Sequence, residues 1–141
     1  MSITPDAVVP LLLAACPSVL PAWEEHLAWW HPDVPGPFNN VSVFAHHVVE
    51  SYAAGRTSEL PAFFSAVEHL LSDAEPATRE LIVIGLLEDI QNVASHQSCG
   101  YDVFLPMLGP AAREQWAALE ATWQGKGSLM DVLRAEARAR K

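Results

Sequence analysis

The sequence predicts an all-α fold, a compact single-domain bundle of seven to eight helices. No segment alternates apolar and polar residues as a half-buried strand does, whereas apolar residues recur at helical spacing between proline, glycine and serine residues. The connections between these segments are short, which is typical of helical bundles. We therefore expect one domain over residues 1–141, with half of its residues hydrophobic and five tryptophans available for a core.

Helix-start and helix-stop residues divide the N-terminal half into three helices. Thr4, followed by a proline and an acid, predicts the start of the first helix. Prolines at positions 32, 35 and 37 then force an extended loop. Asn39 or Asn40 can cap the third helix, and Gly55 suits the position just after its end. The predicted helices cover about 4–15, 18–30 and 40–54.

The C-terminal half begins with a pair of helices. Thr57 and Ser58 predict the start of one helix, and Pro76 predicts the start of a long central helix that continues to His96. This pair, at about 58–96, resembles a single HEAT-like hairpin, and no second copy follows at a fixed period. We therefore expect a helical hairpin within the bundle. Further helices are predicted at about 101–105, 110–123 and 128–140.

The central helix is the most informative segment. It is apolar on nearly every side through Leu81–Leu87, so we expect other helices to cover it all round. Gly85 costs about 1 kcal/mol relative to alanine in a helix interior, which predicts that another helix approaches closely there. With α-helical periodicity, one row of this helix contains Ile84, Glu88 and Gln91.

A polar patch follows the apolar run. Glu88 and Asp89 lie on rows that are apolar higher up, so each carboxylate needs hydrogen bonds or water. They either bond to loop amides near residues 98–101 or to an arginine, or they contact a partner. The candidate partner-binding residues are Glu88, Asp89, Gln91, Asn92, His96 and Trp30.

Two aromatic groups have different interpretations. Trp116, Leu119 and Trp123 recur at helical spacing, which predicts core residues. Trp29 and Trp30 are adjacent and point about 100° apart on a helix, so they cannot both face one core layer. We expect one of them to be exposed beside the proline-rich loop, where it could anchor a partner.

Charge separates the body of the chain from its end. Residues 1–128 contain fifteen Asp and Glu against three arginines and one lysine, a formal balance of −11. Such a body repels phosphate and anionic lipid, which disfavours direct binding of nucleic acid or membranes. It suits a basic protein partner or simply favours solubility. Residues 129–141 carry a formal +2 and could cap the acidic body or mediate dimerisation.

The two cysteines, Cys16 and Cys99, have no metal-binding or CxxC spacing. We see no signal peptide, and the apolar stretch Val8–Ala15 is too short to span a bilayer. The sequence therefore predicts a cytoplasmic protein with reduced thiols.

Catalytic motifs are missing from the sequence. His46 and Glu50 share one helix face, and with His69 they are the best candidates for a metal-dependent enzyme. However, the Glu-x-x-His pairs of helical metal sites, the His-Glu-x-x-His motif, the Gly-x-Ser-x-Gly elbow and glycine-rich phosphate loops are all absent. We therefore predict no enzymatic activity, no cofactor and no bound metal, and a metal-dependent enzyme is the less favoured alternative.

Two motifs carry a family resemblance. The segment LIVIGLLEDIQNVA, which begins at Leu81, and the later FLPMLGP, which begins at Phe104 and precedes the tryptophan row, resemble a family of small all-helical bacterial proteins without assigned enzymatic activity. Some members of that family look like immunity proteins of polymorphic toxin systems. The resemblance covers about residues 58–124. It implies the signature positions Gly85, Glu88, Asp89, Gln91 and Asn92, and it implies no catalytic residue.

These observations lead to one functional hypothesis and two alternatives. The first is a cytoplasmic immunity or antitoxin-like protein that occludes a basic toxin domain through its acidic surface. The second is a helical adaptor or scaffold whose hairpin binds a partner helix. The third is the metal-dependent enzyme described above.

Overall fold

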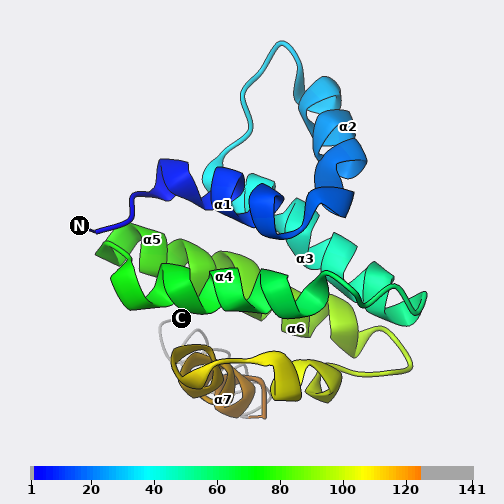
Figure 1. The fold of residues 1–141 in the computed structure, drawn as a ribbon, viewed down its shortest axis with the longest axis vertical. Coiled ribbons are helices and arrows are strands. Elements are labelled where there is room, and N and C mark those ends of the chain that lie inside the picture. The colour runs from blue at the N-terminus through cyan, green and yellow to red at the C-terminus, as the bar shows by residue number, and fades with distance from the viewer. Residues whose placement is uncertain (1, 125–141) are drawn as a thin grey trace, which may run out of the picture.

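The described residues, 2–124 of this computed structural model, form an all-α fold (Figure 1). The π-helical segment Leu81–Leu87 joins α5 to α6, and we call the continuous run over residues 76–95 the central helix. Short 3₁₀ turns lie at Pro5–Ala7, Pro17–Val19 and Asp102–Met107. The α-helices are α1 (Val8–Ala15), α2 (Leu20–Trp30), α3 (Pro37–Ala53), α4 (Leu60–Asp73), α5 (Pro76–Glu80), α6 (Glu88–Ser95) and α7 (Pro110–Gln124).

Most helix ends agree with the sequence prediction, and two starts differ. Gly55 has φ +78° and follows the end of α3, as predicted. However, α3 begins at Pro37, because proline is already preorganised for the first helical position, so neither Asn39 nor Asn40 caps it. Likewise α4 begins at Leu60 without a side-chain cap. The predicted helix at 128–140 and the basic C-terminal residues lie outside the described part of the chain.

The helices stack in layers (Figure 1). In this view α2 and the loop after it stand above α1 and α3, the central helix and α4 lie below these, and α7 lies at the bottom. One contiguous cluster of buried side chains runs through these layers from Val8 to Leu119. It includes Trp116, which is fully buried as the sequence predicts, whereas the side chain of Trp123 lies outside the described part.

Gly85 explains why α3 packs so closely on the central helix. The central helix makes its most extensive contacts with α3. Its partner in the predicted hairpin, α4, contacts it less. A Cβ atom at Gly85 would lie 2.9 Å from Cδ1 of Phe38 and 3.0 Å from Cγ2 of Val41. Any larger residue would have to displace these side chains of α3, which confirms the packing reason predicted for Gly85.

The π-helical segment changes which residues of the central helix face the core. Longer turns over Leu81–Leu87 shift the later residues of this helix relative to α-helical periodicity. As a result Ile84 is 47% exposed while Gln91 is fully buried, although the sequence analysis placed both on one row. The prediction that other helices cover the apolar run all round was therefore wrong on the side of Ile84.

Glu68 on α4 holds the start of α7 by direct hydrogen bonds. Its Oε2 and Oε1 accept hydrogen bonds from the backbone N–H groups of Ala111 and Ala112, both at 2.8 Å. These groups belong to the first turn of α7, where backbone donors have no partner within the helix. A Cβ at Gly109 would lie 2.5 Å from Cδ of Glu68, so glycine is needed for this contact. The Gly-Pro of the second sequence motif thus forms a docking turn.

Candidate functional site

The uncovered side of the central helix borders a groove beside α3. Phe38, 48% exposed, and Ile84, 47% exposed, are the large apolar side chains that line it. Its volume is about 380 Å³. We call it the α3–α6 groove, and it is lined by Phe38, Asn39, Ser42, Ile84, Gly85, Glu88, Asp89 and Asn92. The groove therefore brings together three of the six candidate partner-binding residues, all from α6.

Glu88 and Asp89 are half-buried residues that line the groove. Within residues 2–124, neither side chain has a hydrogen bond or an ion pair. The structure therefore shows neither the alternative bonds to loop amides near 98–101 nor a bond to any of the three arginines among the described residues. Asn92, one turn further along α6, is exposed and lines the same groove.

Gln91 does not belong to this surface, and its prediction as a partner-binding residue was wrong. The side chain is fully buried, and its Nε2 donates a hydrogen bond to the backbone oxygen of Trp116 at 3.1 Å. The extra turn length of the π-helical segment rotates Gln91 toward α7. Its Oε1 and the Trp116 Nε1 are both buried without a partner among the described residues.

His96 and Trp30 are not among the residues that line the groove. His96 is exposed beyond the end of α6 and does not line the groove. Trp30 is half-buried, with its ring 6.4 Å from that of His26. Its neighbour Trp29 is 78% exposed and packs edge-on against it at 5.4 Å. The exposed member of the tryptophan pair is thus Trp29.

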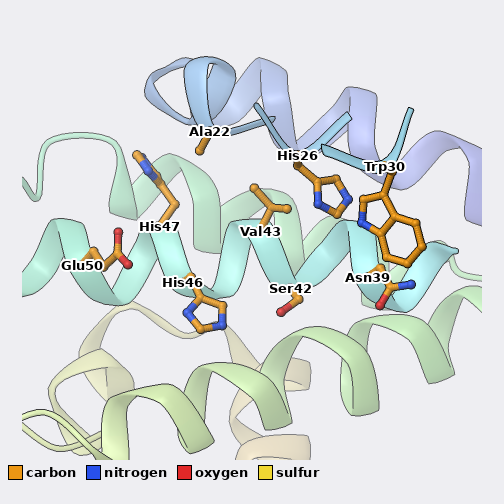
Figure 2. Close-up of a pocket in the computed structure, with 9 residues that line it drawn as sticks. All are labelled: Ala22, His26, Trp30, Asn39, Ser42, Val43, His46, His47 and Glu50. Atoms are coloured by element: carbon orange, nitrogen blue, oxygen red, sulfur yellow. The ribbon is translucent and has the colours of Figure 1, made fainter. Parts of the chain in front are cut away.

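A second hollow adjoins the groove across α3 (Figure 2). It has a volume of about 360 Å³, and Trp30 and His26 line its α2 side. Figure 2 shows Ser42 and His46 on the side of α3 that faces the central helix. Asn39 and Ser42 line both this hollow and the groove, so the two form one continuous surface. We call this second site the Trp30 hollow.

Apart from the histidines of the Trp30 hollow, the charged residues of this surface are all acidic. Glu50, Glu88 and Asp89 line the hollow or the groove, and no arginine or lysine of the described chain lines either. Two of the three described arginines are held elsewhere by backbone oxygens: Arg79 donates to Leu71 and Arg113 to Leu108. The field at this surface therefore attracts cationic groups.

Comparison with known proteins identifies the family of this chain. The sequence matches a domain of unknown function (DUF7674) over residues 9–124. The chain belongs to this family. The match includes α2 and α3 and so extends beyond the region of about 58–124 in which the motifs were recognised. No curated protein and no solved structure matches the chain.

In this DUF7674 chain the residues named for the less favoured metal-dependent alternative do not come together. His69 lies on α4, where its Nδ1 is 3.7 Å from a carboxylate oxygen of Asp73. His46 and Glu50 lie on α3 at the Trp30 hollow. Throughout residues 2–124, no three His, Cys, Asp or Glu side chains are grouped so that they could hold a metal ion.

Sequence reasoning missed a contact between a serine and a histidine. Ser18 Oγ lies 2.8 Å from Nε2 of His47, and burial lowers the pKa of this histidine. Such a pair can activate a serine as a nucleophile. Here, however, Glu59 accepts a hydrogen bond from the Ser18 N–H at 3.0 Å, which lowers the pKa of Glu59. Its negative charge would oppose a developing oxyanion, so we interpret the contact as a tie between the start of α2 and α3.

No single helix within residues 2–124 has both the length and the apolar character needed to cross a membrane. The bent pair Pro5–Ala15 and Pro17–Trp30, at 102° to each other, meets the length and composition criteria together.

Proposed function

We propose that this protein binds a basic toxin domain and neutralises it by occlusion, as an immunity or antitoxin-like protein. The α3–α6 groove and the Trp30 hollow form the contact surface, and the protein acts sterically and electrostatically, without catalysis. The observation that carries the proposal is the pair Glu88 and Asp89, half-buried in a groove and unpaired within the described chain. We place the encounter with the toxin in the cytoplasm.

The energetics of this surface favour a partner. Glu88 and Asp89 line the groove without a partner in residues 2–124, so a cation from a partner could form charge-assisted hydrogen bonds with both. Burial of the exposed parts of Phe38 and Ile84 would add apolar stabilisation. Toxins that act on nucleic acid need basic clefts for phosphate, and an acidic surface is steered rapidly to such a cleft.

The second candidate is an adaptor that binds a partner helix. It is favoured by one observation, the exposed apolar side chains of Phe38 and Ile84 between two helices. A helix that binds mainly through apolar contacts would stay bound at high salt, whereas a complex held by opposite charges would dissociate.

The test is a pull-down from the native host with the tagged full-length protein, at about 50 mM and at about 0.5 M salt. Wild type is compared with the double variant Glu88→Lys, Asp89→Lys. The matched control is Asp102→Lys, Glu114→Lys, which reverses two exposed charges away from the groove. Circular dichroism checks that each variant is folded.

We expect wild type and the control to recover one basic protein at low salt, and the groove variant to lose it. The purified partner should be a toxin whose activity is blocked at a stoichiometric ratio. Retention of the partner by the folded groove variant would overturn the proposal. A partner that resists high salt and is not inhibited would establish the adaptor instead.

A further inference from the structure

The α3–α6 groove combines negative charge with apolar sides. Glu88 and Asp89 are consecutive residues of the central helix and line the same groove without partners in residues 2–124. Phe38 and Ile84 line it with about half of each side chain exposed. A group that fits must therefore bring a positive charge that reaches two carboxylates, together with a stem that packs against apolar side chains.

We propose that the groove binds the guanidinium group of an arginine presented by the toxin partner; this inference rests on the proposed function. The planar guanidinium has five N–H donors in a fixed fork, so it can serve Glu88 and Asp89 at once. Its face can stack on the exposed ring of Phe38. A lysine ammonium is a compact and strongly hydrated charge, so it would lose more hydration on entering the groove.

The neighbouring hollows define the residues beside this arginine. Across α3, the groove continues into the Trp30 hollow through Asn39 and Ser42. On its other side, Ile84 is shared with a third hollow of about 300 Å³. Pro76 and Val83 provide its apolar lining, and its polar lining is Arg79, Glu80 and Gln115. The three sites in a row fit a short segment in which an apolar residue lies on each side of the arginine.

The test uses short peptides, so it does not depend on the identity of the toxin. The ¹⁵N-labelled full-length protein is titrated with the blocked peptide Ac-Ala-Leu-Arg-Leu-Ala-NH₂ and followed by NMR. A second peptide carries citrulline, which is uncharged and nearly the same shape, in place of arginine. We expect amide shifts centred on Gly85, Glu88 and Asp89, and binding weaker by about tenfold or more for the citrulline peptide.

Charge-removing variants locate the binding site. The double variant Glu88→Gln, Asp89→Asn should lose the arginine peptide, and the matched control Asp102→Asn, Glu114→Gln should keep the wild-type affinity. Equal binding of the two peptides would overturn the inference, because the positive charge of the arginine would then contribute nothing. Equal weakening by the two double variants would also overturn it, because the attraction would then be to the general charge of the protein.

Two further outcomes separate this inference from the proposed function. If wild type ignores the arginine peptide while a toxin complex is still lost in the Glu88→Lys, Asp89→Lys variant, the arginine assignment is overturned and the proposed function stands. If the peptide binds only after Arg134→Gln, Arg138→Gln and Arg140→Gln are introduced, the groove belongs to this chain's own C-terminal residues, which also overturns the inference.

Discussion

At the scale of single residues, burial and partners decide the role of each polar side chain. Gln91 and Asp89 are two residues apart, yet one ties α6 to α7 and the other borders a groove without a partner among the described residues. The same distinction applies to the histidines. His69 is exposed beside Asp73, whereas His47 is half-buried against Ser18.

His47 gives a prediction for the pH dependence of stability. Burial lowers its pKa, while Glu59 and Glu50 oppose this effect and Arg56 adds to it. His47 therefore binds a proton more readily in the unfolded chain than in the folded chain. The free energy of unfolding should fall as the pH decreases below about 6.5, and the fall should end below the lowered pKa of the folded state. The variant His47→Gln should show a shallower decrease in urea unfolding between about pH 7.5 and about pH 5.5.

The exposed His96, whose side chain has no partner among residues 2–124, provides the control for this experiment. His96→Gln should keep the wild-type dependence on pH, because this side chain is neither buried nor paired. Identical slopes for wild type and His47→Gln would contradict the prediction.

At the scale of helices, α7 depends on a carboxylate from another helix. Glu68 on α4 accepts two backbone hydrogen bonds at the start of α7. Without it, two donors at a helix N-terminus lose their charged acceptor, and the favourable interaction with the helix dipole is lost as well.

Glu68→Ala should therefore lower the free energy of unfolding by about 1–2 kcal/mol. Amide hydrogen exchange should increase most over α7, because α7 is the helix that loses its anchor. Glu114→Ala, an exposed acid within α7, serves as the control and should change stability little. If exchange over α7 stays at its wild-type rate in Glu68→Ala, the docking role of Glu68 is wrong.

At this scale the sequence predicted the positions of the helices well, but it did not predict which face of the central helix is buried. Proline, glycine and apolar spacing predicted the order and approximate bounds of α1 to α7, because these signals act locally. The orientation of the central helix could not be predicted. Leu81–Leu87 is apolar on every side, so the pattern contains no information about which face is buried, and the π-helical turns then rotate the residues of α6. Hence the sequence grouped Glu88, Asp89 and Asn92, which line one groove, whereas it missed Ile84 and misplaced Gln91.

At the scale of the whole molecule, repulsion between like charges is the main electrostatic feature. Residues 2–124 contain fifteen acids and three arginines, and His69 forms an ion pair with Asp73 when the histidine is protonated. Added salt screens repulsion between exposed charges, and there are few attractive pairs for it to weaken.

The melting temperature should therefore rise by a few degrees between about 20 mM and about 500 mM NaCl. The Glu88→Gln, Asp89→Asn variant should start from a higher melting temperature at low salt and gain less, because two unpaired charges have been removed. Differential scanning calorimetry measures both values. A melting temperature that falls with salt would mean that attractive pairs dominate.

The tryptophans of this fold also provide a built-in optical readout. Trp116 is fully buried in the core, while Trp29 is 78% exposed beside the Trp30 hollow. Acrylamide, a neutral quencher, should reduce the red-shifted emission of Trp29 first and leave the blue-shifted emission of Trp116. Iodide should quench less than acrylamide, because the negative surface repels it. Partner binding at the hollow and loosening of the core can thus be followed separately in unlabelled protein.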